Sequence, residues 1–390
     1  MPSTMFLTMV LCFALSISVA VSIGLASLVG AWQANLNLLA IVKEMFGAIN
    51  KFPLAAIPFF ILAGNLMESG GISQRLVDFA KSIVGGLQGG LAATCVLTCM
   101  IFAAVSGSSV ATTFAIGAIL IPALIKHGYP TNFAAALQAT SAELGVVIPP
   151  SIPMILYGVA AEVSIGELFI SGFGPGLLIG GALMLFVIVY ARVKGYGKGD
   201  REGKMPVLAA TRHAGLALLM PVIILGGIYG GIFTPTEASV VAVFYALIVG
   251  VGVYRETKIA DLPRVLRKSV ISSAVIMFII ANAGLFSYLI TRAGVPDAIG
   301  AFLVEWLRSP LLFLLGVNAA LFVIGMFIET SASIIVLAPI LAPVAQHFGI
   351  DPVHFGIIMV VNLALGMITP PFGVNLFAAC TVARISVDRI

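Results

Sequence analysis

Two clusters of hydroxyl side chains interrupt otherwise apolar stretches of this sequence. The first reads Ser106-Gly-Ser-Ser-Val-Ala-Thr112 and the second reads Glu329-Thr-Ser-Ala-Ser333. Oxygens of hydroxyl groups and unwound backbone carbonyls suit a hard cation such as Na⁺. A single Ser or Thr in a membrane helix often only bonds to the backbone or packs against a neighbour. Two clusters in matching surroundings favour a binding role instead.

Each cluster is followed by a proline pair within an apolar stretch. One stretch reads Gly145-Val-Val-Ile-Pro-Pro-Ser-Ile-Pro153 and the other reads Gly366-Met-Ile-Thr-Pro-Pro-Phe-Gly373. Proline removes an amide donor and its ring clashes with the preceding turn, so a helix must unwind there. Unwound backbone at membrane depth is tolerated only where protein or a water-filled cavity covers it. The sequence therefore predicts two discontinuous helices.

Glu143 is an acidic residue inside an apolar region, two residues before the first of these breaks. An intramembrane acid is a functional candidate by default. Its equivalent in the second half of the chain is Ala364, so symmetry gives it no support. Two roles remain open for Glu143, a structural cap on the unwound amides and a part in ion coupling.

The composition is that of a polytopic membrane protein. The chain has 390 residues, 60% hydrophobic and 9% charged, with a mean hydropathy of +1.15. Soluble domains carry about 25% charged residues. The net charge of +4 comes from basic residues gathered in a few loops, so it does not indicate nucleic acid as a partner. A membrane-embedded enzyme needs a nucleophile with a base, or a motif such as HExxH, and the sequence has neither.

Apolar stretches of sufficient length predict the membrane spans. We expect a retained first helix over residues 5–30, followed by spans near 52–69, 171–191, 214–232, 237–254 and 270–291. Two amphipathic stretches, 37–52 and 72–83, fit helices at the membrane interface. We expect Thr236 and Glu237 to build a tight turn between two spans.

Two regions do not fit ordinary spans. Residues 92–125 are interrupted by the first hydroxyl cluster, which leaves arms of about 14 and 12 residues, whereas a crossing needs about 20. A re-entrant helical hairpin with a polar tip fits this pattern. Residues 311–346 repeat it around the second cluster, with longer arms.

The two halves of the chain form a repeat. The second proline pair follows the first by 221 residues, and the same offset aligns four further pairs: Gly145 with Gly366, Pro122 with Pro343, Gly128 with Gly349, and Thr112 with Ser333. The loops 192–212 and 255–268 hold six and five Lys or Arg residues, which places both in the cytoplasm. Threading the spans from these loops opens the first hairpin to the cytoplasm and the second to the other side, near Arg292 and Arg308. The repeat is therefore predicted to be inverted.

Inverted repeats whose discontinuous helices meet at the midplane are typical of secondary transporters. The helix N-termini that a break creates carry free N–H groups and partial positive charge, which favour a carboxylate. The fold predicted is an all-α polytopic membrane protein, an inverted-repeat transporter with two re-entrant hairpins and two discontinuous helices.

Four motifs in order resemble the large membrane (M) subunit of TRAP transporters. They are the first hydroxyl cluster, Ile148-Pro-Pro-Ser-Ile-Pro-Met-Ile-Leu-Tyr-Gly158, Thr234-Pro-Thr-Glu-Ala-Ser239 and Ile368-Thr-Pro-Pro-Phe-Gly-Val-Asn-Leu-Phe377. The resemblance implies an elevator mechanism and Na⁺-coupled uptake of an organic acid, of the sialic acid or C4-dicarboxylate type. It further implies a periplasmic substrate-binding (P) subunit, a small four-helix membrane (Q) subunit and a place in the bacterial inner membrane.

The resemblance also implies two Na⁺ sites, each between a hairpin tip and the broken helix of its own half. The residues carried over to the first site are Ser106, Gly107, Ser108, Gly145, Val146 and Pro149. Those of the second site are Glu329, Thr330, Ser331, Gly366, Met367 and Thr369. The substrate would lie between the tips, near Ser108, Ser109, Ser151 and Asn375. No organic cofactor is implied.

The elevator implied by the resemblance divides the chain into scaffold and transport segments. We expect scaffold in 1–70, transport in 71–170, scaffold in 171–291 and transport in 292–390. A counterpart of the span 171–191 would begin at about residue 392, so we expect a further helix after Ile390. A related Na⁺-coupled carboxylate carrier that works without a binding protein is the alternative function.

Overall fold

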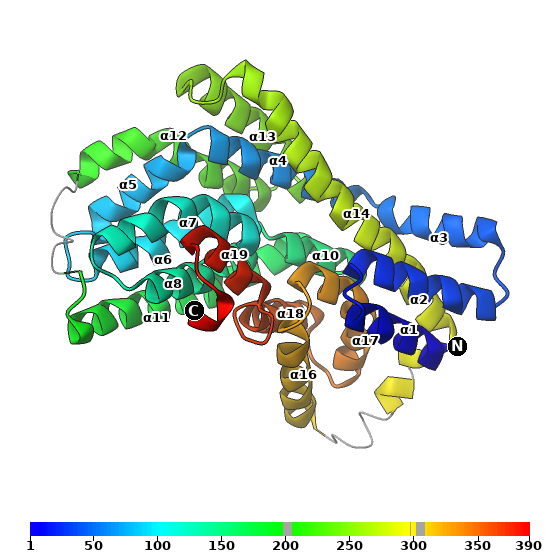
Figure 1. Cartoon of the computed structure of the whole chain (residues 1–390). Helices are drawn as coiled ribbons and strands as arrows, with labels where there is room; N and C mark the ends of the chain where they lie inside the picture. Colours follow the sequence, from blue (N-terminus) through cyan, green and yellow to red (C-terminus); the bar gives the residue numbers. More distant parts are fainter. Residues whose placement is uncertain (198–204, 297, 302–308) are drawn as a thin grey trace.

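The computed structural model describes residues 1–197, 205–296, 298–301 and 309–390, and the elements that it assigns there are helical (Figure 1). The α-helices are α1 Pro2–Ala14, α2 Val19–Gln33, α3 Leu38–Ile49, α4 Ala56–Ser69, α5 Ile72–Val84, α6 Gly90–Ser106, α7 Ser109–Lys126, α8 Thr131–Ala142, α9 Leu144–Val147, α10 Ile152–Ala160, α11 Ile165–Lys194, α12 Val207–Tyr229, α13 Pro235–Leu247, α14 Leu262–Arg292, α16 Pro310–Gly325, α17 Thr330–His347, α18 Pro352–Met367 and α19 Val374–Ala383. Short 3-10 turns η1, η3 and η4 lie at Phe52–Ala55, Ile259–Asp261 and Val387–Arg389, and a π-helical turn η2 at Ile248–Val253.

Seven helices in the described part of the chain are long and apolar enough to cross a membrane, or eight if one bent pair is a single span. Five of them confirm the spans predicted after the first: Phe52–Ser69, Ile165–Lys194, Val207–Tyr229, Pro235–Val253 and Ile259–Arg292. Of the two residues predicted to build the turn before α13, Glu237 does so, with Thr234 and not Thr236 as its partner. The hydroxyl of Thr234 accepts the amide of Glu237, whose carboxylate accepts the amide of Thr234 at 2.8 Å, which is a capping box.

The prediction of one helix over residues 5–30 is wrong. The chain forms two short helices there, α1 and α2, which pack against each other. Ser16 adopts a left-handed conformation with φ of 58°, and the amide of Ile17 bonds back to the carbonyl of Cys12 at 3.0 Å. This closure satisfies the last carbonyls of α1 and reverses the chain. The sequence shows little sign of the reversal, because Ser16 and Ser18 are the only polar residues there and the stretches on both sides are apolar.

Each predicted hairpin is a pair of contacting helices, α6 with α7 and α16 with α17, and the arms of the first are longer than predicted. α6 and α7 hold 17 and 18 residues, joined by Gly107 and Ser108. The polar residues after Ser108 continue α7 because their hydroxyls bond within its first turn. Thr112 donates to the carbonyl of Ser108 at 2.8 Å and Thr113 to that of Ser109 at 3.0 Å. In the second hairpin, Thr330 to Ser333 likewise form the first turn of α17, and the connection is Met326 to Glu329.

The repeat is visible in the bounds of the helices. α7 and α17 have the same length, and both the start and the end of α17 follow those of α7 by 221 residues. α8 and α18 begin at the same offset, and both are interrupted as predicted. The first break bends the chain by 41° between Thr131–Val147 and Ile152–Ala160, and the second separates α18 from α19.

The open ends of the two hairpins lie in different surroundings. Gln88, before α6, donates to the carbonyl of Tyr196 at 3.3 Å. The ring of Tyr129, after α7, lies tilted against the Tyr196 ring, with 5.9 Å between the ring centres. The first hairpin therefore opens beside the end of α11, where the loop 192–212 begins. In the second hairpin Phe313 of α16 packs on Phe348, just after α17, at 4.7 Å. Residues 198–204 of that loop, and Arg308, lie outside the described residues.

The two amphipathic stretches form α3 and α5. α3 has no buried residue and runs beside α14 (Figure 1), with Leu38, Leu39 and Phe46 exposed. α5 differs because its apolar face is covered by α6 and α12, which buries Leu76 and Ala80. Protein, rather than lipid, therefore covers the apolar face of α5.

The helix α11 packs on the first hairpin and on both broken helices. It contacts α6, α9, α10 and α18. Glycines four residues apart, Gly172, Gly176 and Gly180, allow this approach. The predicted boundary at residue 171 thus falls inside a helix whose contacts lie with the hairpin segments.

Candidate functional site

The tip of the first hairpin lies against the first helix break. The amide of Ile152 donates to the carbonyl of Gly107 at 3.2 Å, which pins the start of α10 to the tip. Gly107 has φ of 64°, and a Cβ there would lie 2.9 Å from the carbonyl oxygen of Pro150. A Cβ on Gly145 would lie 2.9 Å from the carbonyl oxygen of Ser108. Both contacts leave no room for a side chain.

The structure therefore brings together most residues predicted for the first cation site. Ser106 directs its hydroxyl toward the carbonyl of Ser108 at 3.4 Å, and Ser108 is in contact range of Gly145. The carbonyl of Val146 accepts the hydroxyl of Ser151 at 2.5 Å, and Pro149 is buried in the segment between α9 and α10. The result is a set of hydroxyl and carbonyl oxygens around one helix break.

The second tip meets the second break in the same way. The amide of Gly373 donates to the carbonyl of Met326 at 3.0 Å. A Cβ on Gly366 would lie 2.5 Å from the Cα of Gly325, so the two backbones touch. The hydroxyl of Thr330 lies 2.9 Å from the sulfur of Met367. Gly373 follows Ile152 by 221 residues, so equivalent amides anchor the two broken helices to their tips. The acceptors are not equivalent, because Met326 lies two residues before Ile328, the counterpart of Gly107.

Glu329 caps α17 with its carboxylate. One oxygen accepts the amides of Ser331 and Ala332 at 2.9 and 3.2 Å, and the other accepts the hydroxyl of Ser331 at 2.8 Å. A carboxylate at a helix N-terminus is favoured by the free amides and the dipole. Thr369, two residues after the end of α18, donates its hydroxyl to the carbonyl of Leu365 at 2.8 Å.

Asn375 links the two halves. Its side-chain amide donates to Glu143 at 2.6 Å, and its oxygen accepts the hydroxyl of Thr113 at 2.9 Å. The other carboxyl oxygen of Glu143 is buried without a hydrogen-bond partner. Glu143 precedes α9, and its side chain makes no capping bond there; the hydrogen bond that it accepts comes from Asn375. Thr113 was missed because its sequence neighbours do not reveal a partner 262 residues away.

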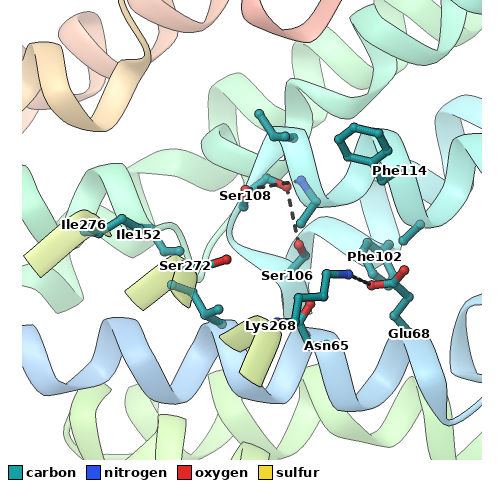
Figure 2. A pocket seen from close by; sticks show the side chains of 15 residues that line it. Asn65, Glu68, Phe102, Ser106, Ser108, Phe114, Ile152, Lys268, Ser272 and Ile276 are labelled. Carbon is teal, nitrogen blue, oxygen red and sulfur yellow. Dashed lines mark hydrogen bonds and ion pairs between the residues drawn. The ribbon is translucent and has the colours of Figure 1, made fainter. Parts of the chain in front are cut away.

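A cavity of about 510 Å³ lies between the first tip and the helices α4 and α14 (Figure 2). Ser106 and Ser108 line it from the tip. The other polar lining residues are Asn65, Glu68, Lys268 and Ser272. Of the residues predicted for the substrate, Ser108 lines this cavity, while Ser109, Ser151 and Asn375 are buried away from its lining.

The sequence did not predict that the hydroxyl tip would face polar residues of α4 and α14 across a cavity. From the sequence, Lys268 is recognised only as a member of the basic loop 255–268, and Asn65 and Glu68 only as part of a span. Asn65 and Glu68 are one turn apart on α4, so the sequence does place them on one face of a helix. Nothing in the sequence puts that face opposite the hydroxyl cluster.

The fold is shared with a known class of membrane transporters. The structure superposes on the transporter YdaH of Alcanivorax borkumensis with a TM-score of 0.60, covering 90% of this chain and 82% of that one at 17% identity. The helices, the paired tips and the broken helices thus define a polytopic membrane protein of transporter fold.

Residues 6–390 match the family model of the tripartite ATP-independent periplasmic transporter DctM component. The C4-dicarboxylate TRAP transporter large permease DctM of Pseudomonas aeruginosa is 48% identical, over 87% of this chain and 79% of its own. The isethionate TRAP transporter permease DctMQ of Oleidesulfovibrio alaskensis is 43% identical, over 96% and 59%. The sialic acid permease SiaM of Vibrio cholerae is 37% identical, over 93% and 84%.

The chain belongs to the DctM family of TRAP transporter large permeases. It is a multi-pass membrane protein of a bacterial transport system and not an enzyme. A tripartite system implies P and Q components beside the large permease.

Proposed function

We propose that this chain couples Na⁺ entry to the uptake of an organic acid that a periplasmic binding protein delivers. The observation that carries the proposal is the repeated anchor, in which the amides of Ile152 and Gly373 bond to the carbonyls of Gly107 and Met326. Each anchor holds an unwound helix end against a hydroxyl-bearing tip. Paired broken helices of this kind supply amides for an anion and carbonyls for a cation.

The hairpins are proposed to be re-entrant and the repeat inverted, so that the two tips approach from opposite sides. In the elevator that the family resemblance implies, the segments 71–170 and 292–390 form the moving body, and 1–70 and 171–291 form the scaffold. The contacts of α11 favour one change, because this helix packs on α6, α9, α10 and α18. We therefore assign α11 to the moving body.

Two Na⁺ sites are proposed, one at each tip and break. Ser106, Gly107, Ser108 and the backbone at Gly145, Val146 and Pro149 would hold the first ion. Glu329, Thr330, Ser331, Gly366, Met367 and Thr369 would hold the second. Carbonyl, carboxylate and hydroxyl oxygens are appropriate ligands for a hard cation. Glu143 is a further candidate for ion coupling because one of its buried oxygens has no partner.

The substrate is proposed to enter the cavity at Ser108. Relatives are named for C4-dicarboxylates, isethionate and sialic acid, all of which are organic anions. Ser109, Ser151 and Asn375 lie behind the tip, where their side chains are buried, and would shape the site rather than line the cavity. The partners are a P protein in the periplasm and a four-helix Q subunit, with the permease in the inner membrane.

The proposal is tested by reconstituting the permease with its Q subunit in proteoliposomes. Labelled succinate, isethionate and N-acetylneuraminate are offered with and without the P protein, under an inward Na⁺ gradient or a K⁺ gradient. Uptake of one of them that requires both Na⁺ and the P protein is expected. Uptake without the P protein would support a carrier that takes anions from solution. Equal uptake under the Na⁺ gradient and the K⁺ gradient would contradict the proposal.

A further inference from the structure

The cavity beside the first tip has two chemically different walls. The wall from the hairpin presents Ser106 and Ser108, whose hydroxyls carry no charge. The opposite wall presents Glu68 from α4 and Lys268 from α14, joined by an ion pair of 2.7 Å (Figure 2). Among the lining residues Lys268 is the one cation and Glu68 the one anion.

This ion pair is exposed to the solvent of the cavity. The side chains of Lys268 and Glu68 are 56% and 38% exposed. Exposed pairs are weak because water screens the charges and both long side chains lose freedom when they pair. The ammonium group of Lys268 is therefore available to a competing anion at little cost.

An organic acid in this cavity needs a donor or a cation for its carboxylate. The hydroxyls on the tip supply hydrogen bonds, and Lys268 supplies the charge from the other wall. We propose that Lys268 binds the carboxylate of the solute, and that Glu68 competes with the solute for the same ammonium group. The inference rests on the proposed function, since it identifies the residue of the scaffold that recognises the anion.

The position of Lys268 indicates the side of the membrane on which it would bind the solute. Lys268 is in the second turn of α14 and is the last residue of the basic stretch 255–268, which the charge distribution puts in the cytoplasm. The solute would meet Lys268 when the tip faces that side. Recapture of the ammonium group by Glu68 would then favour release of the solute.

The experiment measures binding of succinate, isethionate and N-acetylneuraminate to the permease–Q complex in nanodiscs by calorimetry. K268Q is expected to weaken binding of the bound anion about tenfold, as for the loss of a charged hydrogen bond. E68Q is expected to tighten it several-fold, because the competitor is gone. R267Q is the matched control, since Arg267 is an exposed neighbour that does not line the cavity, and its affinity should equal that of the wild type.

Opposite effects of K268Q and E68Q on affinity distinguish an anion-binding site from an ion pair that only stabilises the fold. If the ion pair only stabilises the fold, K268Q and E68Q break it equally and their affinities change in the same direction or not at all, which overturns the inference. Na⁺-driven uptake by the wild type, together with unchanged affinity in K268Q, would reject this inference alone. A wild-type complex that neither binds nor transports any of the three anions would contradict the proposed function as well.

Discussion

Asn375 and Glu143 form the shortest polar link between the two halves of the molecule among the hydrogen bonds described here. The amide of Asn375 reaches Glu143 on one side while its oxygen accepts Thr113 on the other. All of this lies inside the protein, where a polar group without a partner costs more than a hydrogen bond gains. The bond between Asn375 and Glu143 therefore positions α19 against the first broken helix.

Replacing Asn375 with Ala should lower the free energy of unfolding by about 1–3 kcal/mol, because Glu143 loses its partner. Denaturant or thermal unfolding of the purified permease measures the change. N132A, on an exposed asparagine at the start of α8, is the control and should be near neutral. In an E143A background N375A should cost less; additive costs would mean that the two side chains do not interact.

Ser108 and Thr330 are the tip hydroxyls assigned to the two proposed ion sites. S108A and T330A should each raise the Na⁺ concentration needed for half-maximal uptake several-fold, because each removes an oxygen ligand. Uptake titrated with Na⁺ in proteoliposomes measures this. T381A is the control, since Thr381 bonds only within its own exposed helix turn. An unchanged Na⁺ dependence in both variants would contradict the assignment of Ser108 and Thr330 to the ion sites.

At the scale of elements, close backbone contact holds the hairpin, the break and α11 together. A Cβ on Gly172 of α11 would lie 2.6 Å from the carbonyl oxygen of Val147, directly before the first break. Gly174, on the same helix, has nothing within 4 Å of such an atom. Gly172 thus lies where the helix touches a backbone carbonyl, whereas Gly174 faces open space.

G172A should therefore destabilise the permease by about 1–3 kcal/mol, as overpacking does, because a backbone oxygen cannot move aside like a side chain. G174A is the matched control and should be neutral or slightly stabilising. Unfolding midpoints and the yield of folded protein in detergent are the measurements. Equal effects of the two substitutions would show that α11 does not pack on the break as described.

At the scale of the whole molecule, the two halves carry the same elements in the same order. α7 and α17 have equal lengths, and in each half an equivalent amide, of Ile152 or Gly373, bonds a broken helix to a tip. The first hairpin opens beside Tyr196 at the end of α11, whereas the second opens beside Phe348. The second segment of each broken helix packs on the first segment of the other, α10 on α18 and α19 on α8.

Cysteines placed at the last residues of α7 and α17 test the orientation of the repeat. Lys126 and His347 are equivalent and exposed, and the four native cysteines are buried. K126C should react with a membrane-impermeant maleimide from the cytoplasmic side, and H347C from the periplasmic side. Labelling of intact cells and of inverted vesicles distinguishes the two. Reaction of both from one side would contradict an inverted repeat.

The sequence by itself determined the membrane class, five spans, both helix breaks and the repeat, because apolar length, proline and a fixed offset are local or periodic signals. It failed where a local signal was ambiguous. Ser16 reverses an apolar run, and the hydroxyls after Ser108 bond into the first turn of α7, so the polar stretch is helix and not loop.

Only the tertiary structure decided which side chains face each other. The pairing of Glu143 with Asn375 joins residues 232 positions apart, and the cavity sets Lys268 opposite Ser108. Such neighbours follow from how helices pack, because the packing depends on glycine contacts and side-chain volumes contributed by several helices at once. The pattern of residues along one helix can show which face is buried, but it does not show which other helix covers that face.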